Sequence, residues 1–240
     1  METLQDKHVV VVGATGGIGR ALAKLLVNSR AHVYLTSTKP DDAQALAAEL
    51  KLDGERAHTL DVTDHEQVLA KAEAIEAQCG EGGVDILINA SGIGVIKPIE
   101  SLSYEDFSRT LDVNLKGAFS LLKGFVPPMK ARKRGLIINL PGVLGKTPMA
   151  GAAAYAASKY GLNGMLKSVR EELRRTNVRI TNLYLGGTDT PFWDEIDIRV
   201  QKEKFVTAEE AARSIWFLCQ QPSSGVVSEM VLQPFNHQAI

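Results

Sequence analysis

The chain has 240 residues, of which 45% are hydrophobic and 23% charged, and these ordinary globular values predict a buried core. Its formal net charge of −1 favours neither nucleic acid nor an anionic membrane surface as a partner, and no apolar run is long enough to span a bilayer. Cys79 and Cys219 have neither the spacing of metal ligands nor that of a disulfide framework. Residues 1–7 carry no signal-peptide pattern, so we expect a cytoplasmic protein with reduced thiols and no bound metal.

Short apolar, β-branched runs alternate along the chain with longer segments of helical period. The short runs predict strands at 8–12, 33–36, 57–60, 85–89, 136–140, 178–185 and 229–232. The periodic segments predict helices at 18–29, 41–50, 64–79, 104–130, 152–175 and 208–220. We expect Pro127 and Pro128 to fray or end the helix at 104–130.

The order of these elements predicts the fold class. Apolar strands without polar alternation are buried on both faces of a sheet, and strand–helix–strand repeats predict parallel pairing through right-handed crossovers. We therefore expect an α/β fold: a single doubly wound Rossmann-type domain over residues 1–240, with three layers and a mostly parallel seven-stranded sheet. Ligands bind such sheets beyond the carboxyl ends of the strands, so the strand ends are the candidate site.

A glycine cluster joins the first predicted strand to the first predicted helix. The chain there must turn sharply, admit a pyrophosphate to the backbone and pack helix on sheet, and glycine meets all three needs because it has no Cβ. The helix N-terminus adds free N–H groups and a positive dipole end. The spacing differs from the common G-x-G-x-x-G, and glycines can serve a turn alone, but the position favours a dinucleotide loop. Its residues are Gly13, Thr15, Gly16, Gly17, Ile18 and Gly19.

The third and fourth predicted strands end in further candidates for cofactor binding. Asp61, next to Val62, could accept a hydrogen bond from an adenine amino group; the alternative is a place in the cap of the next helix, a role that Asp64 already fills. The fourth strand is followed by small side chains that let a flat ring and a ribose approach the backbone, although alone they would form an ordinary turn. These residues are Asn89, Ala90, Ser91 and Gly92.

The end of the second predicted strand bears on the choice between NADP and NAD. An acidic residue at this point binds the ribose 2′-hydroxyl and repels a 2′-phosphate, and none is present. Ser37, Thr38 and Lys39 stand there instead, and hydroxyls with an ammonium can hold a phosphate. We therefore expect NADP, with NAD as the alternative; a surface turn with one solvated lysine explains the same residues.

Tyr155 and Lys159 form a candidate reactive pair near the start of a predicted helix. They are four residues apart and so share one helical face. A free phenol has a pKa near 10, and lowering it to about 7 requires roughly 4 kcal/mol in favour of the phenolate. A close ammonium and an oxidised nicotinamide ring are sources of that energy, and the phenol would then protonate a carbonyl oxygen as hydride reaches the carbon. The alternative is a half-buried tyrosine beside a solvated lysine, which the glycine loop on this fold disfavours.

Taken together, these motifs resemble the short-chain dehydrogenase/reductase family over nearly the whole chain. The resemblance implies an NAD(P)(H)-dependent oxidoreductase acting on a carbonyl/alcohol pair, with Tyr155 as general acid/base and Lys159 also binding the nicotinamide ribose. Asn114 matches a family helix motif, which implies that it kinks its helix and holds a proton-relay water. The segment after the sixth strand is similar to a Pro-Gly-x-x-x-Thr motif, with leucine in place of proline. It implies cofactor contacts from Gly186, Thr188 and Thr190.

One position departs from the family pattern. A catalytic serine usually lies thirteen residues before the tyrosine, and that position here is Gly142. In the family this hydroxyl hydrogen-bonds the substrate carbonyl, and losing one donor to a developing oxyanion typically costs ~10²–10³ in rate. Ser91 or Thr147 could supply a hydroxyl, but nothing in the sequence places either one in the site.

Two hypotheses follow from Gly142. In the first, the chain reduces a small carbonyl or conjugated acceptor without the serine, as do some family members that act on pterins or enoyl groups. In the second, it binds the cofactor as a sensor or scaffold with weak or no catalysis, which the intact Tyr155, Lys159 and Asn114 disfavour. A nucleotide-sugar epimerase ranks last because only about 188–206 is available as a substrate loop.

The remaining expectations concern the substrate loop and assembly. Phe192 and Trp193 predict an apolar or aromatic wall for a small-molecule substrate, or packing residues beneath a lid. The predicted helices at 104–130 and 152–175 carry small and apolar residues on more than one face. Because the family pairs these helices across a two-fold axis, we expect a homodimer or homotetramer.

Overall fold

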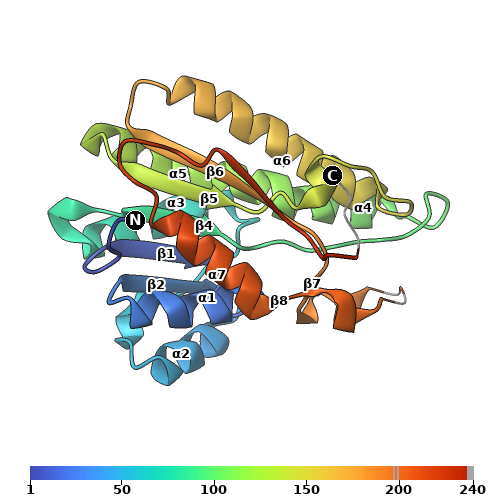
Figure 1. Ribbon diagram of the computed structural model, residues 1–240, viewed down its shortest axis with the longest axis horizontal. Helices are drawn as coiled ribbons and strands as arrows, with labels where there is room; N and C mark the ends of the chain where they lie inside the picture. The colour runs from blue at the N-terminus through green and yellow to red at the C-terminus, as the bar shows by residue number, and fades with distance from the viewer. Residues whose placement is uncertain (197, 199, 237–240) are drawn as a thin grey trace.

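The computed structural model describes residues 1–196, 198 and 200–236. Its centre is a seven-stranded sheet with the order β3-β2-β1-β4-β5-β6-β9 (Figure 1). Every neighbouring pair in this sheet is parallel, so the prediction of a mostly parallel seven-stranded sheet is confirmed. The strands are β1 His8–Val12, β2 His32–Ser37, β3 Ala57–Thr59, β4 Ile86–Asn89, β5 Gly135–Asn139, β6 Val178–Leu185 and β9 Glu229–Leu232.

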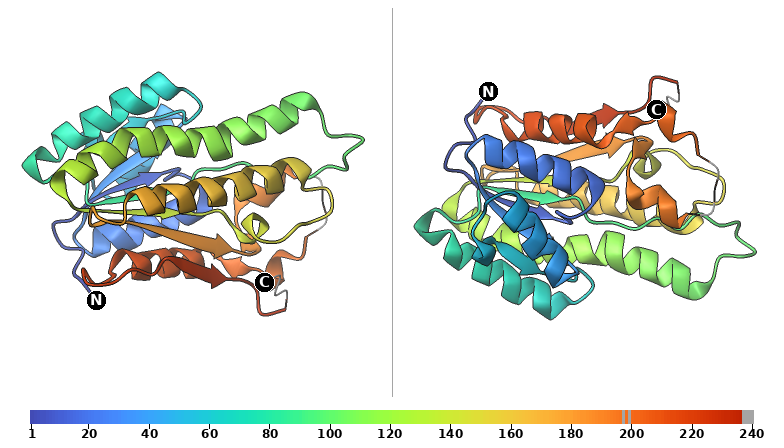
Figure 2. Two further views of the ribbon diagram at one scale, coloured as in Figure 1. Left: turned by 90° about the horizontal axis from the view of Figure 1, so that it is seen from above. Right: turned by 90° about the horizontal axis from the view of Figure 1, so that it is seen from below.

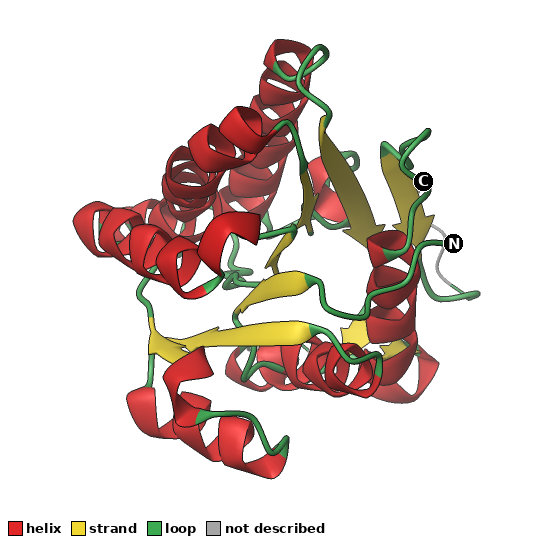
Figure 3. Ribbon diagram, turned by 90° about the vertical axis from the view of Figure 1, so that its left-hand side faces the viewer, coloured by secondary structure: helices red, strands yellow, loops and turns green. Residues whose placement is uncertain are grey.

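Helices cover both faces of the sheet, as Figures 2 and 3 show. They are α1 Gly17–Asn28, α2 Pro40–Glu49, α3 His65–Gln78, α4 Tyr104–Leu111, α5 Gly117–Arg132, α6 Ala153–Glu172 and α7 Ala208–Cys219. One face buries α1, α2 and α7 in a core that includes Leu22 and Ile215. The other buries α3, α5 and α6, with Phe125 and Leu166. The strands are apolar throughout because both faces are covered, and the predicted three-layer architecture is confirmed.

The predicted helix at 104–130 is interrupted and also runs further than expected. A π-helical turn, η3 Asp112–Lys116, separates α4 from α5. The expectation that Pro127 and Pro128 end the helix is wrong, because α5 continues through both. The buried side chains of Phe125 and Met129 hold these turns on the core, while Pro127 faces solvent, where water can satisfy the carbonyls that lose a partner.

The strand order reverses at β1, which lies between β2 and β4. Val12, at the end of β1, pairs with Thr36 on one side and Asn89 on the other. Just beyond the strand, the Ala14 N–H donates to the Thr36 carbonyl at 2.9 Å, and the Ala90 N–H donates to the Val12 carbonyl at 3.0 Å. The carboxyl ends of three strands therefore meet at the point where open α/β sheets bind ligands.

A polar network fastens α6 to the far edge of the sheet. Tyr184 Oη lies 2.8 Å from Asn163 Oδ1 and 3.2 Å from Glu229 Oε1. Lys146 Nζ donates to Glu229 Oε2 at 2.6 Å and lies 4.1 Å from the centre of the Tyr184 ring. Asn163 Nδ2 donates to Gly145 O at 3.0 Å. Because Gly145 and Lys146 follow β5 in the chain, the network fixes the loop after β5 beside α6.

Two short strands lie outside the main sheet. β7 Thr188–Asp189 and β8 Val206–Thr207 pair in parallel at the end of the molecule where the main strands have their carboxyl ends (Figure 1). They bracket the predicted substrate loop, of which residues 197 and 199 lie outside the described residues. The loop also holds short helical turns at Pro191–Glu195 and Lys202–Lys204.

Three general features complete the description. No described helix is long and apolar enough to cross a membrane. The described residues contain no cluster of three or more side chains suited to a metal ion. Cys79 and Cys219 are both buried and free.

Candidate active site

The glycine loop between β1 and α1 is packed so closely that side chains would not fit. Gly13 has a φ of +77°, and a Cβ there would lie 3.0 Å from Ser91 N. A Cβ at Gly19 would lie 2.2 Å from Gly13 O, and one at Gly17 would lie 2.9 Å from Thr190 Cγ2. The loop therefore meets the end of β4 and the segment after β7 through bare backbone, as a phosphate-binding turn requires.

The start of α1 leaves its backbone donors available. Gly16 at the N-cap offers no side-chain cap, and the first turn holds no acidic residue, so the N–H groups and the positive end of the dipole face the loop. Thr15 Oγ1 donates to Ser37 Oγ at 3.0 Å, which ties the loop to β2. This arrangement suits a pyrophosphate beside Thr15, Gly16, Gly17 and Ile18.

The end of β2 presents hydroxyl groups and one ammonium. Ser37 is buried, whereas Thr38 and Lys39 are exposed. Ser37 Oγ also accepts a hydrogen bond from Lys39 N at 3.2 Å, so the loop and the following turn converge on this hydroxyl. The carboxylates of Asp41 and Asp42 belong to the first turn of α2 and not to the strand end.

Two aspartates after β3 have separate roles. Asp64 caps α3 by accepting a backbone N–H at 3.0 Å, as predicted. Asp61 Oδ1 accepts from Thr63 N at 2.9 Å and from Thr63 Oγ1 at 2.7 Å, and Asp61 is exposed. Val62 is buried against Gly117, where a Cβ would lie 2.7 Å from Val62 Cγ2. Asp61 therefore lies exposed just after the edge strand β3, with its Oδ1 bonded to Thr63 in a local turn.

Asn89 organises the turn after β4. Its Oδ1 accepts from Ser91 N at 3.2 Å and from Ser91 Oγ at 2.6 Å. The Ser91 hydroxyl is therefore engaged with Asn89. A Cβ at Gly92 would lie 3.2 Å from Asn114 Oδ1 and 3.5 Å from Lys159 Nζ, so this turn reaches the side chains expected to be catalytic.

Tyr155 and Lys159 lie on the same face of α6 at this edge. Lys159 Nζ is 5.5 Å from the centre of the Tyr155 ring. The ammonium donates to Leu140 O, directly after β5, at 2.9 Å, and Lys159 is only 5% exposed. The pair therefore lies beside the ends of β4 and β5.

Asn114 joins this pair from the π-helical turn. Its Nδ2 donates to Ile93 O at 2.9 Å and to Ser158 Oγ at 3.0 Å, and its Oδ1 accepts from Ile93 N at 2.9 Å. Asn114 thus links the turn after β4 to α6. Ser158 and Leu140 were not among the predicted site residues: Ser158, buried beside Lys159, had a sequence signal in its polar side chain, whereas Leu140 acts through its backbone carbonyl and had none.

Burial sets the protonation of the pair in this structure. It lowers the pKa of Lys159 to about 8 and raises the pKa of Tyr155 above its ordinary value. The protein alone therefore does not acidify the phenol as expected from its neighbouring ammonium, because desolvation raises the pKa of Tyr155.

Gly142 has a backbone conformation that explains its identity. Its φ of +69° and ψ of 167° belong to a region that is essentially open to glycine alone. A Cβ there would lie 3.5 Å from Leu185 O. The backbone at this position is thus built for glycine.

Thr147 lies further along the same loop, where its N–H donates to Val143 O at 3.0 Å.

The segment after β6 reaches the glycine loop. Thr188 Oγ1 donates to Gly186 O at 3.1 Å, and Thr190 Oγ1 donates to Thr188 O at 3.4 Å. Both hydroxyls therefore serve the local turn, while the Thr190 side chain is the one that lies against Gly17.

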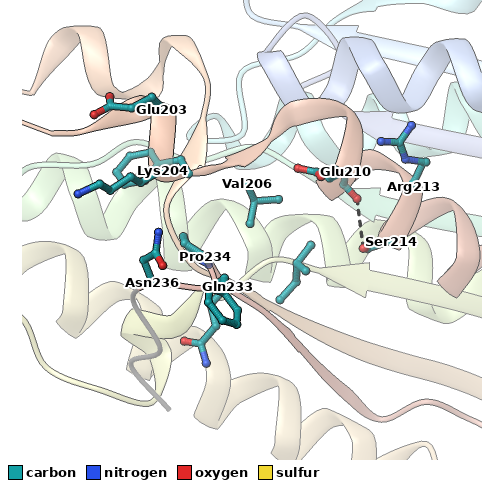
Figure 4. A pocket seen from close by; sticks show the side chains of 12 residues that line it. Glu203, Lys204, Val206, Glu210, Arg213, Ser214, Gln233, Pro234 and Asn236 are labelled. Atoms are coloured by element: carbon teal, nitrogen blue, oxygen red, sulfur yellow. Dashed lines mark hydrogen bonds between the residues drawn. The ribbon is translucent and has the colours of Figure 1, made fainter.

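An aromatic row leads from Tyr155 into the predicted substrate loop. Ring centres are 5.7 Å apart for Tyr155 and Phe192, 5.3 Å for Phe192 and Trp193, and 5.2 Å for Trp193 and Phe205. Phe205 also lines a cavity of about 610 Å³ between β8, α7 and the segment after β9 (Figure 4). Tyr155, Lys159 and Asn114 do not line this cavity, so it lies behind the aromatic row and not at the predicted catalytic centre.

Comparisons with known proteins agree with this geometry. A short chain dehydrogenase family model matches residues 7–201. An uncharacterized oxidoreductase of Staphylococcus saprophyticus is 30% identical over 238 residues, covering 98% of this chain and 100% of that protein. Sepiapterin reductase of Chlorobaculum tepidum is 29% identical over 238 residues, covering 95% of this chain and 96% of that protein.

A solved structure extends the likeness to three dimensions. A metagenomic short-chain oxidoreductase in complex with NADP superposes with a TM-score of 0.83 at 30% identity, covering 97% of this chain and 99% of the other. The chain belongs to the short-chain dehydrogenase family of oxidoreductases.

Proposed function

We propose that this protein reduces a small carbonyl or conjugated acceptor with NADPH, with Tyr155 as the general acid. The observation that carries the proposal is the convergence of Tyr155, Lys159 and Asn114 on the crevice beside the glycine loop. Lys159 Nζ lies 5.5 Å from the Tyr155 ring centre, and Asn114 is bonded to the turn that holds Gly92 and to α6. On this basis the protein acts on a carbonyl/alcohol pair, as oxidoreductases of the CH–OH group do.

The residues of the crevice fit a nicotinamide dinucleotide. Bound there, the cofactor would supply the hydride. The pyrophosphate would rest on the backbone of the glycine loop, because Gly13, Gly17 and Gly19 leave no room for side chains. Asp61 and Val62 would border the adenine, Asn89 to Gly92 the adjoining ribose, and Gly186, Thr188 and Thr190 the nicotinamide end. Lys159 would bind the nicotinamide ribose.

NADP is preferred over NAD for two reasons. The end of β2 offers the exposed Thr38 and Lys39, beside the Ser37 hydroxyl, and no carboxylate, and a cation next to hydroxyl groups favours a 2′-phosphate. The metagenomic relative was solved in complex with NADP.

In the proposed reaction each catalytic side chain has one task. Tyr155 holds its proton at neutral pH, because burial raises its pKa, and it delivers that proton to the substrate oxygen. The Lys159 ammonium faces the same crevice and stabilises the phenolate that remains. Asn114 holds the π-helical turn against Ile93 and Ser158 and keeps the pair in place.

Gly142 supports a second candidate function, a cofactor-binding protein with weak or no catalysis. The position at which the family carries a serine has a glycine-specific backbone, and Ser91 is engaged with Asn89. No hydroxyl has therefore been identified in its place. The retained Tyr155, aligned with Lys159 on α6, weighs against this alternative, because a protein that only binds the cofactor does not need a general acid at this position.

We also propose a homodimer or homotetramer through α4, α5 and α6. Tyr104, Phe119 and Tyr160, one on each of these helices, are 79%, 48% and 44% exposed, so the helices that the family pairs across a two-fold axis carry aromatic rings available for contact. Sedimentation velocity of the purified chain tests this, and a single species of about 26 kDa would refute it. The cytoplasmic location and the single-domain extent stay predictions.

Replacing Tyr155 with Phe removes only the phenolic proton. Turnover of carbonyl substrates with NADPH should fall by about 10²–10⁴-fold, the usual contribution of a general acid, while NADPH binding persists. Tyr160→Phe, on the exposed side of the same helix, is the matched control and should keep full activity. Retained turnover in Tyr155→Phe would refute the assigned role, and an inactive parent across a broad carbonyl panel would favour the binding-protein alternative.

The affinity for NADPH should depend on pH through Lys159. Its folded-state pKa of about 8 leaves the ammonium intact below that pH and converts it to the amine above. If the ammonium holds the ribose, the Kd for NADPH rises above pH 8, by up to about tenfold per unit. Fluorescence titrations between pH 7 and 9.5 measure this, and Lys159→Met should bind more weakly with no such rise. An equal rise in both proteins would contradict the assignment.

Restoring the family serine should not restore a carbonyl donor. Because Gly142 has a φ of +69°, Gly142→Ser should lower the free energy of unfolding by about 1–3 kcal/mol, measured by urea denaturation. Ketone reduction should not increase, since the new hydroxyl would lie by Leu185 O. Gly164→Ser is the control, because a Cβ there meets nothing within 4 Å. A large gain in ketone reduction at unchanged stability would contradict this prediction, because it would show that a serine at position 142 can still donate to the substrate carbonyl.

A further inference from the structure

We propose that Gly94 and Phe192 form a seat for flat, conjugated carbonyl compounds beside Tyr155. This inference rests on the proposed function and names its substrate class. It concerns the contact between a glycine in the loop after β4 and an aromatic ring in the substrate loop. Neither the phosphate loop nor the Tyr155–Lys159 pair requires that contact.

The space beside Gly94 is filled by the Phe192 ring. A Cβ at position 94 would lie 2.2 Å from Phe192 Cζ, 2.8 Å from Cε2 and 3.0 Å from Cε1, so the ring occupies the space that any larger residue would fill. The φ of Gly94 lies outside the left-handed region. Its backbone would therefore accept alanine without strain, and the ring alone demands glycine here.

Two aromatic side chains hold the Phe192 ring in addition to Gly94. On the site side, its centre is 5.7 Å from that of Tyr155 with the planes tilted by 45°, within the range of aromatic pairs. Behind it, Trp193 meets Phe192 edge-on at 5.3 Å and 83°. Trp193 Nε1 donates to Thr188 O at 2.9 Å, which anchors the support to β7.

The seat is also connected to the phosphate loop. A Cβ at Gly17 would lie 2.9 Å from Thr190 Cγ2 and 3.3 Å from Pro191 Cδ. Thr190 and Pro191 directly precede Phe192, so the segment carrying the ring is set against the turn that would hold the pyrophosphate. The position of the ring and that of the cofactor are therefore fixed by the same backbone.

The chemistry of the site favours a flat carbonyl compound on this seat. Reduction adds a hydride, with its two electrons, to the carbonyl carbon and a proton from Tyr155 to the oxygen, and NADPH is oxidised to NADP⁺. The developing charge lies on that oxygen, where the missing serine donor would cost ~10²–10³ in rate. A planar ketone can stack on Phe192, and the binding energy gained there offsets part of that loss by positioning the carbonyl beside Tyr155.

A matched pair of ketones tests the seat. 1-Tetralone has its carbonyl conjugated to a flat ring, and 1-decalone has the same bicyclic skeleton, saturated and puckered. We expect kcat/KM of the NADPH-loaded protein to favour 1-tetralone. Gly94→Ala and Phe192→Ala should each lower that preference by about two- to tenfold, the value of one aromatic stacking contact. Phe192→Leu, which keeps apolar volume without a flat face, should do the same.

A double-mutant cycle shows whether Gly94 acts through the ring. In the Phe192→Ala background, Gly94→Ala should have no further effect on the preference or on the free energy of unfolding, because the obstructing ring is gone. Gly164→Ala is the matched control: it should leave the preference unchanged in both backgrounds and should raise the free energy of unfolding slightly, because alanine favours the interior of α6 more than glycine does. An undiminished effect of Gly94→Ala without the ring, or an unchanged preference with it, would overturn the seat.

Binding separates failure of the seat from failure of the proposed function. Calorimetry of the NADP⁺-loaded protein should show tighter binding of 1-tetralone than of 1-decalone, with the difference reduced in Gly94→Ala. If the parent binds the ketones in this order yet reduces neither, the proposed catalysis fails and the seat stands. If the two ketones bind equally, the seat is wrong whatever the turnover.

Discussion

The buried ammonium of Lys159 is the constraint on which the rest of the site depends. Removing a charge from water is costly unless hydrogen bonds replace the solvent, and the Leu140 carbonyl supplies one at 2.9 Å. That carbonyl is available because β5 has ended at Asn139, so its oxygen is no longer bound to a neighbouring strand. The hydrogen bond from Lys159 to Leu140 O therefore requires that β5 end at Asn139. It also requires that the Lys159 face of α6 lie toward the end of β5.

Two polar clamps keep α6 in that orientation. On one side, Asn114 uses the π-helical turn to reach Ile93 and Ser158 at once, a reach that such turns commonly provide at functional sites. On the other, the network of Tyr184, Glu229 and Lys146 holds the loop after β5. Lys159 lies between them, so its ammonium stays fixed without an acidic partner of its own. Its pKa is low because burial removes the ammonium from water and the single hydrogen bond to Leu140 O replaces only part of that solvent.

The parts of this fold that could be predicted from sequence are those set by composition. Strands buried on both faces are apolar throughout, and the loop requires glycine at position 19 because a Cβ there would lie 2.2 Å from Gly13 O. The parts that could not be predicted from sequence are those that depend on tertiary packing. α5 passes through Pro127 because Phe125 and Met129 hold it on the core. The direction of the Tyr155 pKa shift depends on burial, which has no residue signature.

Gly142 and Gly94 show how the same residue type answers two different demands. At Gly142 the backbone angle requires glycine, whereas at Gly94 the Phe192 ring does. The first removes a polar donor from the site, and the second admits an apolar ring. A polar donor discriminates steeply, because a wrong substrate leaves it buried and unpaired, whereas an apolar surface discriminates by shape, on the order of 10–200-fold per group. A site that has lost a polar donor and gained an apolar surface tolerates different positions of the polar atoms in its substrate. Such a site selects substrates by their shape. That change fits a reductase that accepts several flat acceptors and recognises no single one.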